Sequence, residues 1–75
     1  MKKILVLGAG QSAPYLIHYL LDASQEHDWF VTVGDLDESL AQKRVGSNPR
    51  GKSVFFDVND ADLRATLIQN HDVIV

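Results

Sequence analysis

Hydrophobic residues open the chain as one short, continuous run. Ile4-Leu5-Val6-Leu7 follows two lysines and contains no polar residue. A continuous run is typical of a parallel strand buried on both faces, whereas a strand with one solvated face alternates apolar and polar side chains. We therefore predict a buried parallel strand from Lys3 to Leu7, interrupted by Gly8.

After this strand the apolar positions change to the spacing of a helix. They recur every three or four residues between Gln11 and about Ala23. The positions are Ala13, Leu16, Ile17, Leu20 and Leu21. Such spacing places the side chains on one face of a helix, and Pro14 is tolerated in a first turn, where no amide donor is needed. We expect the polar segment 24–28 to end the helix and to link it to the next strand.

The middle of the chain predicts a second strand and a second helix. Residues 29–33 are aromatic and β-branched and read as a strand that closes at Gly34-Asp35. Asp37-Glu38 suits the first turn of a helix that runs to about Val45, and Gly46 is a suitable terminator.

A turn, a third strand, a third helix and a fourth strand complete the pattern. Asn48-Pro49-Arg50-Gly51 has turn-forming residues at every position. The predicted strand 53–56 ends at Asp57, a helix covers residues 60–69, and a further strand opens at 72–75. We expect the inner stripe of that helix to consist of Leu63, Leu67 and Ile68.

Strands and helices thus alternate with short connections, which favours right-handed crossovers and a parallel α/β sheet. The doubly wound arrangement predicts the strand order 3-2-1-4. The fourth strand would then have an open, apolar edge, which is a template for pairing with another strand. We interpret residues 1–75 as the amino-terminal half of a larger domain, with no second domain in this chain, and we expect the isolated segment to be marginally stable or to form homo-oligomers through that edge.

The first strand-to-helix turn carries the candidate chemistry. Gly8-Ala9-Gly10-Gln11-Ser12-Ala13 has the Gly-x-Gly-x-x-Ala pattern of a Rossmann-type dinucleotide site. Gly8 permits the sharp turn, Gly10 leaves room for a pyrophosphate beside the main chain, and Ala13 allows close packing of the helix. The phosphates would lie at the helix amino terminus, bordered by the backbone amides of Gln11 and Ser12. A tight turn with no ligand is the alternative, and we favour the cofactor because an acidic residue follows the next strand.

That acidic residue is Asp35, which lies 22 positions beyond Ala13. We expect its carboxylate to accept hydrogen bonds from the adenosine ribose of NAD. The alternative role is the N-cap of the next helix. A carboxylate here would repel the 2′-phosphate of NADP, and Leu36 offers no compensating charge, so the sequence favours NAD over NADP as the cofactor.

Asp57-Val58 ends the third strand at the same edge of the sheet. We expect Asp57 to accept from the amino group of adenine and Val58 to pack on the ring. A helix cap ahead of Asp60 explains Asp57 equally well.

The other polar and aromatic residues favour structural roles. No histidine pair has metal-ligand spacing, so we assign no metal. We also assign no catalytic residue to this segment. The histidines are His18, His27 and His71. Arg44, Arg50 and Lys52 are predicted to lie on a solvated face away from any phosphate. Trp29 and Tyr15 are expected in core or edge packing.

Composition excludes several classes. The net charge of −3 disfavours nucleic acid as a partner. The absence of cysteine excludes disulfides and thiolate metal sites. The apolar run is too short for a signal peptide or a membrane span, so we expect a cytoplasmic protein.

The motif resembles a particular family. Gly8 to Pro14, followed by Tyr19-Leu20-Leu21, is similar to the opening of the saccharopine dehydrogenase family, and the likeness continues through residues 31–35, 56–60 and 71–75. The resemblance implies an NAD(P)-dependent oxidoreductase of lysine metabolism that acts on the CH–NH group of a secondary amine derived from an amino acid. It also implies a small amino-acid substrate that is bound by a part of the parent protein beyond this segment, which alone would not be an enzyme.

The same resemblance suggests roles for individual positions. The phosphates would be held at Gly8, Gly10, Gln11, Ser12 and Ala13, the ribose at Asp35 and Leu36, and the adenine at Asp57 and Val58. Members that use NADP tend to have an arginine after the second strand, which this chain lacks. Two other classes share a glycine turn with an acidic ribose contact, namely nucleotide-sensing regulatory domains of potassium channels and S-adenosylmethionine-dependent methyltransferases.

Overall fold

The computed structural model describes residues 1–10 and 13–75. Within them, a four-stranded parallel sheet has the order β3-β2-β1-β4. The strands are β1 (Lys2–Leu7), β2 (Trp29–Asp35), β3 (Gly51–Phe55) and β4 (Val73–Ile74), and the helices are α1 (Ala13–His27), α2 (Glu38–Val45) and α3 (Ala61–Gln69). The doubly wound α/β fold and the strand order 3-2-1-4 are confirmed.

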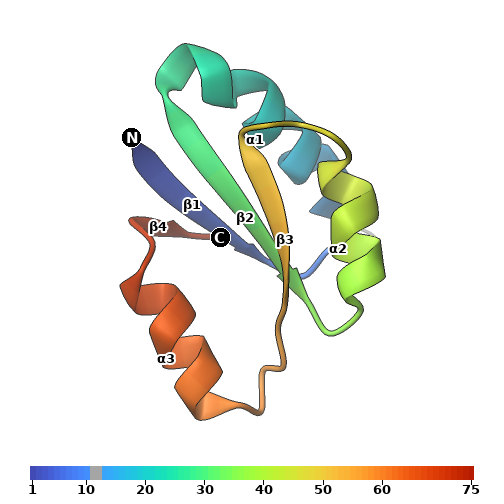
Figure 1. The fold of residues 1–75 in the computed structure, drawn as a ribbon, viewed down its shortest axis with the longest axis vertical. Coiled ribbons are helices and arrows are strands. Elements are labelled where there is room, and N and C mark those ends of the chain that lie inside the picture. Colours follow the sequence, from blue (N-terminus) through green and yellow to red (C-terminus); the bar gives the residue numbers. More distant parts are fainter. Residues whose placement is uncertain (11–12) are drawn as a thin grey trace.

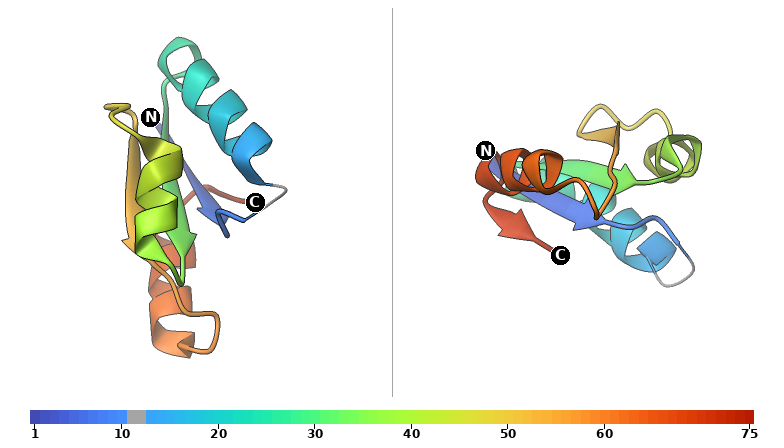
Figure 2. Two further views of the ribbon diagram at one scale, coloured as in Figure 1. Left: turned by 90° about the vertical axis from the view of Figure 1, so that its right-hand side faces the viewer. Right: turned by 90° about the horizontal axis from the view of Figure 1, so that it is seen from below.

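The sheet and the first two helices enclose the core (Figure 1). The core residues are Ile4, Val6, Ala9, Ile17, Leu20, Leu21, Val31, Val33, Ala41 and Val45. They come from the centres of β1 and β2 and from one face each of α1 and α2, as the apolar pattern predicts. Helix α3 lies away from this core, at the other end of the molecule from the middle of α1 (Figures 1 and 2).

Register brings three strand ends to one level. Leu7 pairs with Gly34, and Asp35 pairs with Phe55. The amide of Phe56 still donates to the Asp35 carbonyl at 3.0 Å, one residue beyond β3. The carboxyl ends of β1, β2 and β3 therefore form one edge, from which the turn after each strand departs.

The predicted end of the first helix was wrong. Residues 24–27 continue α1 rather than forming a polar link, and the helix ends at His27. Ser24 is fully buried, and its hydroxyl donates to the Leu21 carbonyl at 2.6 Å, so this polar side chain faces the core without an unpaired donor. Asp28, with φ of 57°, then turns the chain into β2.

The second half of the chain follows the prediction with smaller changes. Asp37 caps α2 and Gly46, with φ of 64°, ends it. In the predicted turn the amide of Gly51 donates to the Asn48 carbonyl at 3.2 Å. The third strand is shifted, because residues 51–53 already pair with β2. The fourth is shorter than the predicted 72–75 and pairs with β1.

Helix α3 does not have the predicted inner stripe. None of its residues is buried: Leu63 and Leu67 are half-buried, and Ile68 is 43% exposed. Helical spacing tells which side chains share a face, but it does not tell whether another element covers that face. Tyr15 was also expected to pack and is instead 91% exposed on α1. Trp29 packs against the core and stacks on His27, with ring centroids 4.7 Å apart.

Candidate functional site

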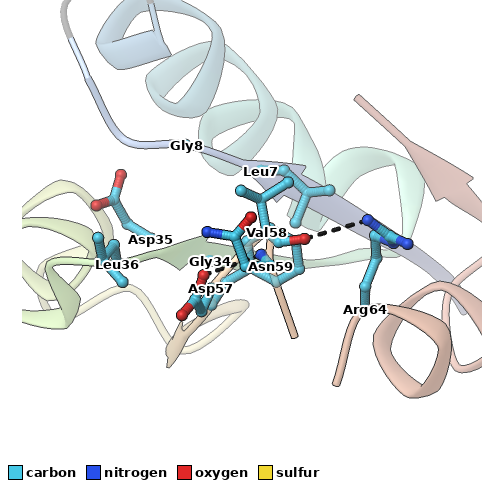
Figure 3. Close-up of a pocket in the computed structure, with 10 residues that line it drawn as sticks. Leu7, Gly8, Gly34, Asp35, Leu36, Asp57, Val58, Asn59 and Arg64 are labelled. Carbon is cyan, nitrogen blue, oxygen red and sulfur yellow. Dashed lines mark hydrogen bonds between the residues drawn. The ribbon is translucent and has the colours of Figure 1, made fainter. Parts of the chain in front are cut away.

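A cavity of about 420 Å³ lies at the carboxyl ends of β1, β2 and β3 (Figure 3). Its walls are formed by the last residues of these strands and by the loop that follows β3. The lining residues are Leu7, Gly8, Gly34, Asp35, Leu36, Phe56, Asp57, Val58, Asn59 and Arg64. The sequence-predicted residues Gly8, Asp35, Leu36, Asp57 and Val58 thus share one cavity.

The glycine turn borders this cavity. Gly8 has φ of 101°, a conformation that strains any residue with a side chain, and its amide donates to the Gly34 carbonyl at 2.7 Å. Gly10 is different, because its φ is not in the left-handed region and a Cβ built on it meets no atom of the described residues within 4 Å. Gln11, Ser12 and the side chain of Ala13 lie outside the described part of the chain.

Asp35 joins the turn to the second βα unit. Its Oδ2 accepts from the amide of Ala9 at 2.7 Å, and its Oδ1 accepts from the amide of Asp37 at 2.8 Å. The N-cap of α2 is Asp37, so the alternative role of Asp35 as a cap is not supported. A carboxylate has about four acceptor positions, so Asp35 retains capacity for further donors.

A second carboxylate lies on the same connection. The Ser39 hydroxyl at 2.6 Å and the Leu40 amide both donate to Asp37, and these hydrogen bonds hold the pKa of Asp37 below its ordinary value. Asp35 and Asp37 flank Leu36, which is exposed. The end of β2 therefore carries two negative charges, which would repel a phosphate group placed beside Leu36.

The loop after β3 forms the far wall. Oδ1 of Asp57 accepts from the amide of Asn59 at 2.9 Å, which makes a local turn, and the cap of α3 is Asp60 rather than Asp57. Val58 is largely exposed, and Nη1 of Arg64 donates to its carbonyl at 3.1 Å. Figure 3 shows Arg64 on the opposite side of the cavity from Asp35.

Sequence reasoning missed Arg64. The available signal was its place in the first turns of the helix that follows β3, four residues after the cap.

Arg44 was predicted to lie on a solvated face, and this was wrong. It is half-buried, and its Nε donates to the Ala9 carbonyl at 3.3 Å, so it contacts the glycine turn across 35 residues of sequence. The contact arises because α1 and α2 pack beside each other.

The remaining polar residues lie elsewhere. Arg50 pairs with Asp28, His18 pairs with Asp22 on the surface, and His71 bridges the Leu67 carbonyl and the Thr32 hydroxyl. Within residues 1–10 and 13–75, no group of three His, Cys, Asp or Glu side chains could hold a metal ion. In the same part of the chain, no helix combines the length and apolar character needed to cross a membrane.

Fold and site together define a Rossmann-like half fold with a cavity at the carboxyl edge of its sheet, where ligands of doubly wound folds bind. Comparison of the sequence with models of known protein families and with curated proteins finds no match. A ligand is therefore inferred from the geometry of the cavity and its turn, and an enzyme class from the resemblance in sequence alone.

Proposed function

We propose that the chain binds the adenosine and pyrophosphate portion of NAD. The observation that carries the proposal is Gly10, because neither its backbone angle nor its surroundings among the described residues require a glycine for folding. Gly10 lies two residues beyond Gly8, which lines the cavity, and open space at such a main-chain position is what a pyrophosphate needs for close approach. The cavity volume of about 420 Å³ also lies in the range of small-molecule sites.

Each part of the cofactor has a proposed contact. The pyrophosphate lies against Gly8 and Gly10 and the start of α1, with Gln11, Ser12 and Ala13 as further contacts. The ribose hydroxyls donate to Asp35 beside Leu36. Adenine lies between Asp57 and Val58, at the wall that Arg64 supports through the Val58 carbonyl.

NAD is proposed over NADP on electrostatic grounds. A 2′-phosphate at the ribose would come close to Asp35, and Asp37 adds a second negative charge to the same connection between β2 and α2. Neither carboxylate has an ion-pair partner among the described residues.

We further propose, from the resemblance in sequence, that this segment belongs to a saccharopine dehydrogenase-like oxidoreductase. NAD supplies the hydride chemistry when it is bound, and the protein supplies binding and orientation. The residues of this chain would hold only the adenosine half of the cofactor, and none of them is assigned to proton transfer or to the substrate amine.

Calorimetric titration of the chain with NAD, NADP and S-adenosylmethionine tests the proposal. We expect NAD to bind more tightly than NADP and S-adenosylmethionine to bind weakly or not at all. Asp35→Asn should weaken NAD binding, while Asp22→Asn, which removes an equivalent charge from the outer face of α1, should leave it unchanged. Binding of S-adenosylmethionine alone would assign the cavity to the methyltransferase class and overturn the proposal.

A further inference from the structure

Beyond Gly8, the backbone of the glycine turn is held by side chains. Gly8 makes the last sheet-like hydrogen bond, from its amide to the Gly34 carbonyl. At Ala9, which is fully buried, the N–H donates to Asp35 and the carbonyl accepts from Nε of Arg44. The two groups come from the end of β2 and the last turn of α2.

The Arg44 contact determines where the next amide points. The Ala9 carbonyl and the Gly10 N–H belong to one planar trans peptide, in which these two bonds point in opposite directions. A donor that fixes the carbonyl therefore also fixes the N–H. Gly10 is exposed, and no described residue accepts from its N–H.

We propose that Arg44 is a positioning residue that aims the Gly10 amide at the pyrophosphate. This inference rests on the proposed function, since it concerns the same turn. Without the Arg44 contact the Ala9–Gly10 peptide can rotate, and the ligand must reorient it on binding. The loss should affect ligands that carry a diphosphate and spare ligands that lack one.

A purely structural role for Arg44 makes a different prediction. Lys43 and Arg44 both lie in the last turn of α2, where positive charge stabilises a helix by interaction with its dipole. If Arg44 acted only in this way, its removal would lower the stability of the fold and would affect all ligands alike.

Two substitutions separate the hydrogen bond from the charge. Arg44→Gln places an amide N–H at the same number of bonds from Cα as Nε of arginine, and it removes the charge. Arg44→Met has as many side-chain bonds as glutamine and no donor. Lys43→Met is the matched control, because it removes a neighbouring charge from the same helix turn. Each variant is titrated with ADP and with adenosine, and its thermal midpoint is measured.

We expect Arg44→Met to bind ADP roughly three- to tenfold more weakly, the effect of one hydrogen bond. Arg44→Gln and Lys43→Met should bind ADP within about twofold of the unsubstituted chain, and all variants should bind adenosine equally. The positioning role would be overturned if Arg44→Met and Arg44→Gln lost ADP affinity equally. It would also be overturned if Arg44→Met lost affinity for ADP and adenosine equally, or lost no affinity at all.

Folding failure is covered by a second donor-free variant. If Arg44→Met does not melt cooperatively, Arg44→Leu replaces it, and failure of both would assign Arg44 to fold stability and overturn the inference. An unsubstituted chain that binds neither ADP nor adenosine would instead overturn the proposed function, and this inference with it.

Discussion

Gly10→Ala separates the needs of the fold from the needs of a ligand. The added methyl group meets no described atom within 4 Å, and the backbone angle at Gly10 is not left-handed. A Gly-to-Ala change at such a position restricts the unfolded chain and stabilises by about 0.4–1 kcal/mol. For a domain of this size that corresponds to a rise of roughly 2–8 °C in the thermal midpoint.

Gly8→Ala is the internal contrast. Its new methyl group also meets no atom of the described residues within 4 Å, but its φ of 101° is a conformation that costs a residue with a Cβ roughly 1–3 kcal/mol. We therefore expect Gly8→Ala to lower the thermal midpoint by several degrees, on the order of 4 °C or more. The two substitutions make the same chemical change two residues apart and should shift stability in opposite directions.

Binding should respond in a different pattern. The methyl group of Gly10→Ala would occupy the space proposed for the pyrophosphate, so ADP and NAD should bind at least about tenfold more weakly, which corresponds to roughly 1.4 kcal/mol. Adenosine should bind as before. Thermal melts and calorimetric titrations on the same samples measure both effects. Unchanged ADP binding, or a loss of stability in Gly10→Ala as large as in Gly8→Ala, would refute the reasoning from open space.

Three further predictions follow from named contacts. Asp35→Ala should weaken the binding of both NAD and NADP, because it removes the contact with the Ala9 amide. It should also raise the ratio of the NAD to the NADP dissociation constant about tenfold, because the ribose loses its acceptor. An unchanged ratio in paired titrations would contradict the ribose role. In urea titrations, Ile17→Ala should lower the unfolding free energy by about 2–5 kcal/mol, whereas Ile68→Ala should change it by less than about 0.5 kcal/mol, and equal losses would contradict their different burial. The Arg50 guanidinium, and then the terminal ammonium, hold the pKa of Asp28 below its ordinary value, so this carboxylate stabilises the fold above the unfolded-state pKa and the effect is lost as pH falls below about 4. Asp28→Asn should therefore show a smaller drop in thermal midpoint between about pH 5 and pH 3 than the unsubstituted chain, and parallel curves would count against the ion pair.

Patterns that act over a few residues explain most of the correct predictions. The apolar run of β1, the cap at Asp37 and the terminator at Gly46 are each determined by neighbours in sequence. The strand order follows from these elements because short connections and right-handed crossovers leave few alternatives. Asp35 could be assigned to the cavity because the carboxyl ends of parallel strands meet at one edge.

The errors share the opposite property. The polar segment 24–27, interpreted as a link, is helical, and it can bury Ser24 because the hydroxyl of this residue donates to a carbonyl of its own helix. Arg44 contacts Ala9 only because two helices pack together. A local sequence pattern does not determine the direction in which a long side chain at a helix end extends. The loose packing of α3 likewise depends on which element covers its apolar face, and helical periodicity does not predict that.

The carboxylate of Asp35 has a structural role besides its proposed role at the ribose. Its carboxylate holds the Ala9 amide and the Asp37 amide even without a ligand, so removing it alters the shape of the turn as well as the proposed ribose contact. Arg44 holds the other side of the same residue and has no proposed contact with the ribose. Loss of ADP binding in Arg44→Met with adenosine binding intact would therefore assign the effect to the turn. A loss of adenosine binding in Asp35→Asn, which Arg44→Met does not show, can then be assigned to the sugar.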